Sequence, residues 1–148
     1  MPLKPTNRAV GCFVECDGKI LLLHRSGHGS HPGTWGLPGG KVDPGETDLA
    51  AIIREMYEEI GLRAQPHELE LLGDFLFDFP EVELHFPAFR LVLNHLPTLK
   101  LDPREHDGYR WITAEAYYAM PKSELIHGSH DLLERAGYIQ KNNLDNRL

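Results

Sequence analysis

Residues 39–62 have the sequence GGKVDPGETDLAAIIREMYEEIGL, a glycine-containing loop followed by a segment with helical periodicity. Five bulky apolar residues recur at helical spacing and fall, at about 100° per residue, within one stripe roughly 100° wide. They are Leu49, Ile52, Ile53, Met56 and Ile60. Thr47 is a suitable N-cap and Gly61 a suitable left-handed C-cap. The stretch therefore predicts a loop, a helix that packs against a core, and a second loop.

Three glutamates, Glu55, Glu58 and Glu59, occupy another arc of this helix, centred on the far side from the apolar stripe. Runs of charge are usually solvated faces. Here each like-charge pair costs roughly 0.2–0.5 kcal/mol, no lysine lies among the glutamates, and the last turn of a helix disfavours anions. A divalent cation such as Mg²⁺ or Mn²⁺ would offset this cost, because such ions take oxygen ligands and keep sites for phosphate. We therefore interpret the glutamates as a metal site.

The same stretch matches the pattern G-x5-E-x7-R-E-U-x-E-E-x-G-U, in which U is a bulky aliphatic residue. This pattern is the Nudix box, and the chain resembles the Nudix hydrolases of the MutT-like kind. Every fixed position is filled, by Gly40, Glu46, Arg54, Glu55, Glu58, Glu59 and Gly61. The two U positions hold Met56 and Leu62. The match covers residues 40–62, so it identifies the motif and leaves most of the chain to weaker signals.

The resemblance implies the Nudix α/β fold, in which a mixed β-sheet is sandwiched between α-helices (an α/β/α sandwich). The 148 residues suit a single domain, residues 1–148, with loose termini at 1–7 and 141–148. The chain pattern gives the elements by range. Strands are predicted at 8–15, 19–24, 35–40, 71–79, 82–93 and 109–112, and short helices at 113–120 and 129–136.

Two details of these strands are specific. Asp17-Gly18 is a hairpin turn signal between the first two strands. Residues 20–23 are continuously apolar, as in a strand buried on both faces. Residues 71–79 and 82–93 predict an antiparallel pair.

The resemblance also assigns a metal-binding set. It comprises the Gly39 carbonyl and the carboxylates of Glu55, Glu58, Glu59 and Glu105. Glu105 is the candidate fourth carboxylate because a glutamate shortly before the last strand reaches the metal in MutT-like proteins. The alternative is a solvated Glu105 beside Arg104, and His106 or Asp107 could take its role instead.

Four more residues receive roles from the resemblance. In this family Glu46 pairs with Arg54, and the arginine holds the neighbouring carboxylates in place. Arg25, at the exit of a predicted strand, and Lys41 would contact the substrate phosphates. For Arg25, an ordinary surface cation is the alternative.

The implied activity is magnesium-dependent hydrolysis of a nucleoside diphosphate linked to a moiety X. Residues 33–40 resemble the nucleoside triphosphate pyrophosphohydrolases, which release a nucleoside monophosphate and pyrophosphate. An ADP-ribose or nucleotide-sugar pyrophosphatase is an alternative, and a non-catalytic nucleotide-sensing module is another. Either Glu55 or Glu105 would accept the proton of the attacking water, and the sequence leaves this choice open.

Histidines and aromatic residues outside the box each have two interpretations. Residues 26–33 predict a mobile glycine-rich loop, in which His28 and His31 are either solvated or in contact with substrate or metal. Trp35 is predicted to pack instead of stacking on a base. Three phenylalanines share one facing and are predicted to pack, although one of them could line a base pocket. They are Phe75, Phe77 and Phe79.

The bulk properties exclude several classes of protein. A formal net charge of −7 argues against a broad basic face for polymeric nucleic acid, so the expected partner is a small nucleotide, and a homodimer is left open. No apolar run approaches the ~18 residues of a membrane span, and residues 1–7 lack a signal-peptide core, so we expect a cytoplasmic protein without membrane contact. Cys12 and Cys16 are expected as free thiols, because two residues facing the same way along one strand are too far apart to bridge.

Overall fold

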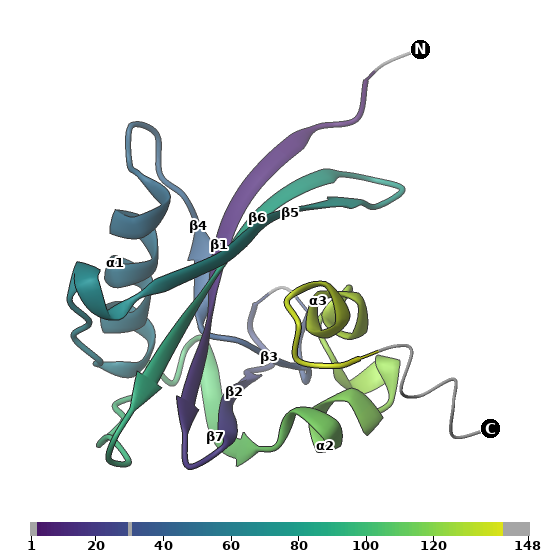
Figure 1. Cartoon of the computed structure of the whole chain (residues 1–148). Helices are drawn as coiled ribbons and strands as arrows, with labels where there is room; N and C mark the ends of the chain where they lie inside the picture. Colours follow the sequence, from purple (N-terminus) through teal and green to yellow (C-terminus); the bar gives the residue numbers. More distant parts are fainter. Residues whose placement is uncertain (1–2, 30, 141–148) are drawn as a thin grey trace.

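The computed structural model describes residues 3–29 and 31–140 of the chain. Within these residues, strands and α-helices follow one another, with short 3-10 turns at Pro66–Glu68 and Lys122–Glu124. The strands are β1 (Thr6–Cys16), β2 (Lys19–Arg25), β3 (Trp35–Gly36), β4 (Gly39–Lys41), β5 (Glu70–Asp78), β6 (Glu83–Leu93) and β7 (His106–Ile112). The helices are α1 (Asp48–Ile60), α2 (Ala114–Ala119) and α3 (Ser129–Arg135) (Figure 1).

All of these strands form one mixed sheet, in which β1 and β6 run parallel and the other pairs run antiparallel. The main order is β3-β2-β1-β6-β5, with β4 paired to β1 and β7 paired to β2. β1 and β2 pair only beside their connecting turn. Beyond it, β4 pairs with β1 and β3 pairs with β2. The start of the Nudix box therefore lies in the middle of the sheet (Figure 1).

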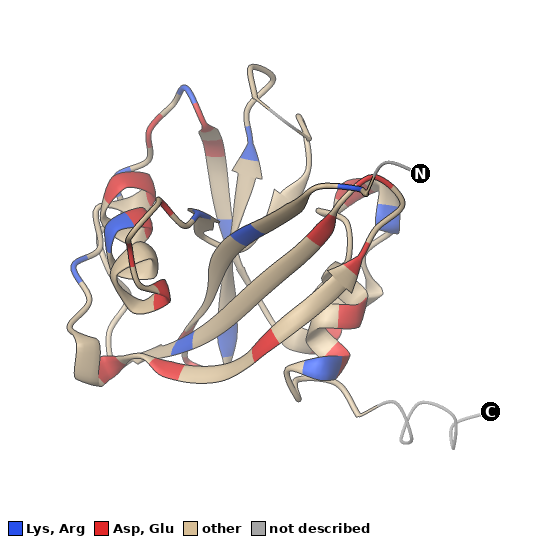
Figure 2. Cartoon of the chain, turned by 90° about the horizontal axis from the view of Figure 1, so that it is seen from above, with Lys and Arg blue, Asp and Glu red and all other residues tan. Residues whose placement is uncertain are grey.

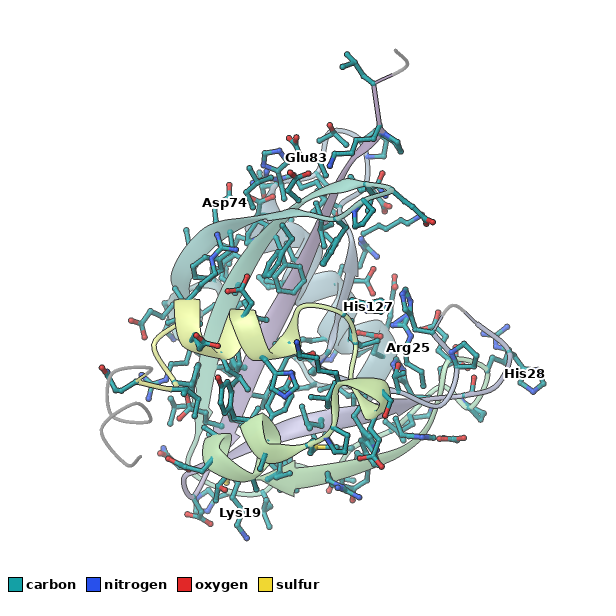
Figure 3. All side chains as sticks on the ribbon, turned by 90° about the vertical axis from the view of Figure 1, so that its right-hand side faces the viewer. Lys19, Arg25, His28, Asp74, Glu83 and His127 are labelled. Carbon is teal, nitrogen blue, oxygen red and sulfur yellow. The ribbon has the colours of Figure 1, made fainter. Side chains whose placement is uncertain are left out.

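The two faces of the sheet carry separate cores, because successive residues of a strand point to opposite sides. On β2, Leu21 and Leu23 join the core under α1, whereas Ile20 and Leu22 join the core under α2 and α3. All four side chains are buried, which confirms the prediction of a strand buried on both faces. Figure 3 shows α2 and α3 lying across the second face. The predicted mixed sheet between helices is thus confirmed.

The local signals of the sequence act as predicted. The hydroxyl of Thr47 accepts a hydrogen bond from the N–H of Ala50 at 3.1 Å, and α1 ends at Gly61 with a φ of 71°. Asp17 and Gly18 both have positive φ, 51° and 74°, as this kind of hairpin turn requires. The boundaries of α1 and of the first hairpin therefore follow from local chemistry.

The first strand starts earlier than predicted. β1 already begins at Thr6, because it extends along the parallel strand β6. Thr6 pairs with Glu83, and Asn7 pairs with Leu84. The expected loose N-terminal segment 1–7 is therefore wrong for Thr6 and Asn7. The other expected loose terminus, 141–148, lies outside the described residues.

Two further boundaries differ from the prediction. The single strand predicted at 35–40 is two strands, since Pro38 between them has no N–H to donate to a ladder. The last strand begins three residues early, at His106, because β7 continues past a bulge to pair His106 with Arg25. This extension brings the residues before the predicted strand against the exit of β2.

β5 is an edge strand, and its charged residues are all acidic. Glu70, Asp74 and Asp78 are exposed along it, and Figure 2 shows this strand with red segments. The guanidinium of Arg135 donates a hydrogen bond to the carbonyl of Leu76 at 2.8 Å. The free edge of the sheet is therefore charged and partly capped.

The remaining expectations concern thiols and membranes. Cys12 and Cys16 are buried free thiols, as predicted. Among the described residues, the longest helix is too short and too polar to cross a bilayer.

Candidate functional site

Arg54, on α1, is the centre of an ion-pair network. Its Nε and Nη2 donate to the two carboxylate oxygens of Glu46 at 2.8 and 2.9 Å, which confirms the predicted pairing. Its Nη1 donates to Glu55 at 3.0 Å and to Glu58 at 3.2 Å, and its Nη2 also reaches the Lys41 carbonyl. The hydrogen bonds from Arg54 lower the pKa of Glu46 to about 2. We call these residues, Arg54 with Glu46, Glu55 and Glu58, the Arg54 network.

Glu59 has a different environment from its neighbours. Its side chain is buried, with the residue only 4% exposed, and its Oε1 accepts a hydrogen bond from the Gly39 N–H at 2.6 Å. Burial raises the pKa of Glu59 to about 8, and the charges of Glu55 and Glu105 contribute to the increase, whereas the Gly39 N–H opposes it. The prediction that all three glutamates face away from the apolar stripe is therefore wrong for Glu59. It follows Ile52 by seven residues, which places it only about 20° from the stripe.

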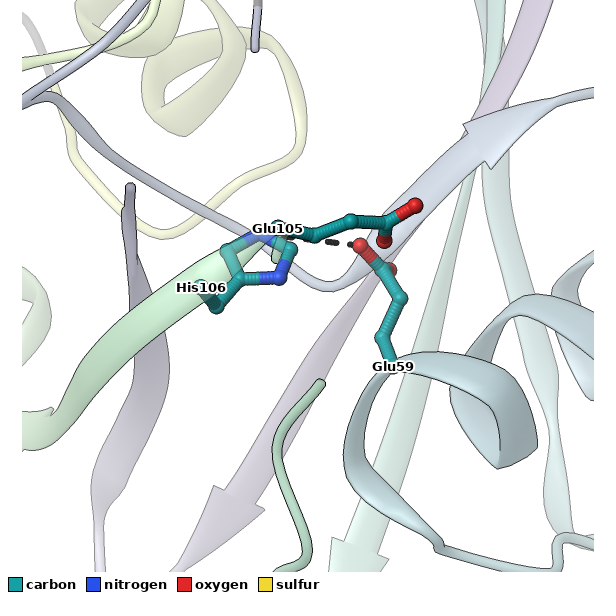
Figure 4. A group of neighbouring side chains, drawn as sticks. All are labelled: Glu59, Glu105 and His106. Atoms are coloured by element: carbon teal, nitrogen blue, oxygen red, sulfur yellow. Dashed lines mark ion pairs between the residues drawn. The ribbon is translucent and has the colours of Figure 1, made fainter. Parts of the chain in front are cut away.

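Glu105 and His106 meet Glu59 from the start of β7 (Figure 4). One ligand atom from each of the three residues lies within 4.8 Å of the others, and His106 Nε2 is 3.6 Å from Glu59 Oε2. We call these three residues the Glu59 cluster. Asp107, one of the alternatives for the fourth ligand, instead contacts His24 at 2.5 Å. His106 is therefore the alternative that the structure brings to Glu59.

The Glu59 cluster suits a divalent cation. Burial and the charge of Arg25 lower the pKa of His106 to about 4, so its imidazole is neutral at neutral pH. Within the described residues, the buried Nδ1 of His106 has no hydrogen-bond partner. The cluster provides oxygen and nitrogen donor atoms, from one buried carboxylate, one exposed carboxylate and one neutral imidazole. None of these three side chains is positively charged. These donors fit the kind of ion that the box implies.

The other predicted ligands lie around this cluster without joining it. Glu55 is oriented by Arg54, and burial raises its pKa. The Glu58 side chain is 56% exposed and turns toward Arg54. Metal binding by Glu55, Glu58 and the Gly39 carbonyl stays a prediction.

The two glycines at the start of the box are required by close packing. A Cβ on Gly39 would lie 2.0 Å from the carbonyl oxygen of Val10, and a Cβ on Gly40 would lie 2.5 Å from Cδ of Glu55. The first contact is with backbone and cannot be relieved locally, whereas the second would displace the carboxylate of Glu55. The glycines therefore let β4 pass directly between β1 and the carboxylate of Glu55.

A cavity of about 270 Å³ opens beside this loop, on the face covered by α2 and α3. Its apolar lining includes Phe77, Phe79 and Phe86, and Arg25 and Lys41 also line it. The structure thus places both predicted phosphate-contacting residues at one cavity. The predicted packing role of Phe75, Phe77 and Phe79 is confirmed, since all three belong to the core under α2 and α3 or pack against it. Phe77 and Phe79 also line the cavity.

Some predictions about the loop residues are resolved by this cavity. Trp35 packs on the same core, as predicted, with the guanidinium of Arg110 lying 4.4 Å from its ring centroid. His31 lines the cavity, together with His127, which the sequence analysis did not single out. His127 could not be found from the sequence, because its loop reaches the cavity only through pairing with β3.

Comparisons with known proteins agree with the motif. The family model described as NUDIX domain matches residues 5–134. The chain is 31% identical over 120 residues to the CTP pyrophosphohydrolase of Escherichia coli (strain K12), covering 76% of this chain and 79% of that protein. It is also 31% identical over 140 residues to the RNA pyrophosphohydrolase of Francisella philomiragia, covering 79% of this chain and 86% of that protein. Among solved structures, the MutT protein from Methanosarcina mazei Go1 superimposes with a TM-score of 0.77 at 27% identity, and both chains are covered completely.

Proposed function

This chain belongs to the Nudix hydrolases, which act on phosphoanhydride bonds, and we propose that its substrate is a nucleoside triphosphate, cleaved to a nucleoside monophosphate and pyrophosphate. The observation that carries this proposal is the position of the cavity. The lining of this one cavity contains residues of the box loop, including Lys41, together with Arg25 and several aromatic rings. The similarity to a CTP pyrophosphohydrolase supports the same class of substrate.

The acidic residues provide the metal site of this reaction. Glu59 and Glu105 would hold Mg²⁺ or Mn²⁺, together with Glu55, Glu58 and the Gly39 carbonyl. Such an ion, when bound, supplies positive charge to the phosphate oxygens and a water of lowered pKa. Attack of a water molecule on a phosphorus of the triphosphate forms a new P–O bond and breaks the P–O bond between the α- and β-phosphates. The products are pyrophosphate and the nucleoside monophosphate.

The chain's own residues bind, orient and accept a proton. Arg25 and Lys41 neutralise charge on the phosphates, and the phenylalanines of the cavity bind the nucleoside ring by stacking and edge contacts. Glu55 or Glu105 takes the proton of the attacking water. Arg54 keeps Glu55 in place through its hydrogen bond, so it acts on the reaction through another residue.

A substrate panel tests this proposal. In the presence of Mg²⁺, the protein would be incubated with one substrate at a time: each of the four nucleoside triphosphates, ADP-ribose and a nucleotide sugar. The products would be identified by ³¹P NMR. We expect pyrophosphate from at least one triphosphate, and its loss with EDTA or in Glu58→Gln. Glu81→Gln, an exposed acid in the β5–β6 turn, is the matched control and should retain activity.

Two outcomes would contradict the proposal in different ways. Cleavage of ADP-ribose or a nucleotide sugar without cleavage of any triphosphate would assign the chain to the alternative class of pyrophosphatase. Binding of nucleotides without magnesium-dependent turnover of any of them would identify a nucleotide-sensing module.

A further inference from the structure

His31 and His127 meet at the cavity from opposite sides. His31 comes from the loop between β2 and β3, and His127 comes from the segment that leads into α3. Their ring centroids are 5.5 Å apart in an edge-to-face arrangement, and both residues line the cavity and are exposed. In Figure 3, His127 lies near Arg25, whereas His28 lies at the far end of its loop. The two histidines predicted as equivalent loop residues, His28 and His31, are therefore separated by the fold.

Backbone hydrogen bonds fix His31 at the cavity. The Arg25 N–H donates to the Thr34 carbonyl at 2.8 Å, and the Gly33 N–H donates back to the Arg25 carbonyl at 3.0 Å. The Thr34 hydroxyl donates to the carbonyl of His31 at 2.7 Å, and His31 itself has a φ of 53°, uncommon for a residue other than glycine. The base of the loop is thus closed directly beside His31.

The opposite side is fixed by β3. The Ile126 N–H donates to the Trp35 carbonyl at 3.0 Å, and the Ile126 carbonyl accepts from the backbone N–H and the hydroxyl of Ser129. His127 therefore projects from a segment that is attached on both sides. The two rings are held by separate elements, and each is exposed to a ligand in the cavity.

The chemistry around the two rings suits an anion. Among the described residues, neither imidazole makes a hydrogen bond or an ion pair with another protein group, although the two rings lie edge to face. The described residues that line the cavity include Arg25 and Lys41 and no aspartate or glutamate. Burial lowers the pKa of His31, and the neighbouring Arg25 and His127 lower it further. Imidazole N–H groups beside a guanidinium are suitable donors for phosphate oxygens.

We propose that His31 and His127 bind the phosphate chain of the substrate directly, together with Arg25 at the same cavity. This rests on the proposed function, because it takes the substrate to be a nucleoside triphosphate. It adds two residues outside the Nudix box to the binding site. It also separates them from His28, which belongs to the same loop and does not line the cavity.

The first test observes the imidazoles directly and needs no turnover. Proton–carbon spectra of the histidine rings, assigned through single substitutions, would be recorded while the full-length protein is titrated with inorganic tripolyphosphate and, separately, with cytidine. We expect tripolyphosphate to shift the His31 and His127 signals saturably and to leave His28 unchanged. Equal shifts of all three, no shift, or shifts caused by cytidine alone would overturn the proposal.

The second test is kinetic. For His31→Ala and His127→Ala we expect KM to increase about tenfold, as for the loss of a hydrogen bond to a charged group, with kcat changed less than about threefold. The increase should be the same for all triphosphates that the enzyme cleaves, and His127→Gln, which keeps an N–H donor, should recover part of it. His28→Ala is the matched control and should behave as the unmodified protein. An unchanged KM, or an increase that depends on the base, would contradict phosphate binding.

The two proposals can fail separately. If no triphosphate is cleaved by the unmodified protein, the proposed function fails, whereas the imidazole spectra still report on phosphate binding at the histidines. Circular dichroism melting of each variant verifies that a changed KM is not a consequence of unfolding.

Discussion

The Arg54 network and the Glu59 cluster use the same residue type on the same helix in opposite ways. In the Arg54 network each carboxylate accepts a hydrogen bond from one guanidinium, and the pKa of Glu46 falls to about 2. In the Glu59 cluster the carboxylate is buried beside a second acid and a neutral imidazole, and its pKa rises to about 8. In the first arrangement every carboxylate has a hydrogen-bond donor within the chain. The second requires a proton or a cation, which is the property expected of a metal site.

Replacement of the buried acid should give the largest effect. In Glu59→Gln we expect activity to fall at least about a hundredfold, since even the loss of groups that only support metal ligands typically costs 10–100-fold. The melting temperature in EDTA should change little, because glutamine resembles the protonated acid that a pKa of about 8 favours at neutral pH. Pyrophosphate release and circular dichroism measure the two quantities. Full activity in this variant would remove Glu59 from the site.

Arg54→Lys tests the Arg54 network. A lysine keeps the charge but loses the planar fork that bonds Glu46, Glu55 and Glu58, so we expect activity to fall roughly 10–100-fold. Arg63→Lys, just beyond the helix, is the matched control, because the Arg63 guanidinium donates a hydrogen bond to the hydroxyl of exposed Tyr57 and lies over its ring. If lysine supports normal activity at position 54, the bidentate geometry of the network is not needed for catalysis.

Metal addition should distinguish the two regions by stability. A ligand that binds only the folded protein, at 100 times its Kd, adds about 2.7 kcal/mol, which corresponds to a rise in Tm of roughly 5–10 °C for a chain of this size. We expect this rise with Mg²⁺ or Mn²⁺ in the unmodified protein and in Glu46→Gln, and its loss in Glu59→Gln. Differential scanning calorimetry with and without EDTA measures it. An equal rise in all three proteins would place the ion elsewhere.

The smallest effect concerns the pH dependence of the Arg54 network. The folded pKa of Glu46, about 2, lies below its usual value of 4.5, so its pairing stabilises the fold above pH 4.5 and the benefit is lost as pH falls toward 2. The difference in Tm between the unmodified protein and Glu46→Gln should therefore be small at neutral pH and vanish near pH 2. Added salt should reduce it, because ions screen charge pairs that are not fully buried. A difference that grows at low pH would contradict this account.

The sequence predicted what local chemistry determines. The caps of α1 and the turn at Asp17-Gly18 are specified within short stretches, and both were found. The Glu46–Arg54 pair, which the resemblance to the Nudix family implied, was found as well. The burial of Glu59 was missed because the three glutamates were treated as one arc, although the helical angle already places Glu59 beside Ile52. Helical geometry alone would have found it.

Other features depend on contacts that the sequence pattern does not contain. β1 starts early because it pairs with the parallel strand β6, in which the partner of Thr6 is Glu83, more than seventy residues later in the chain. The lining of the cavity comes from strands β1 to β6 and from the segment before α3. No single stretch of sequence therefore reveals it. The same holds for His127, which reaches its neighbour His31 only through the fold.

The acidic edge of β5 has a consequence for copies of this chain in solution. If two such strands met in the symmetric antiparallel register centred on Asp74, Asp74 would face its own counterpart and Glu70 would face Asp78. Each of these acids is ion-paired within its own chain, to Arg90, Arg8 and Lys4 respectively for Glu70, Asp74 and Asp78, and the Leu76 carbonyl is hydrogen-bonded to Arg135. A second strand would have to rearrange these contacts in order to pair with β5. The contacts along β5 therefore make this uncovered strand a poorer template for pairing with another copy of the chain.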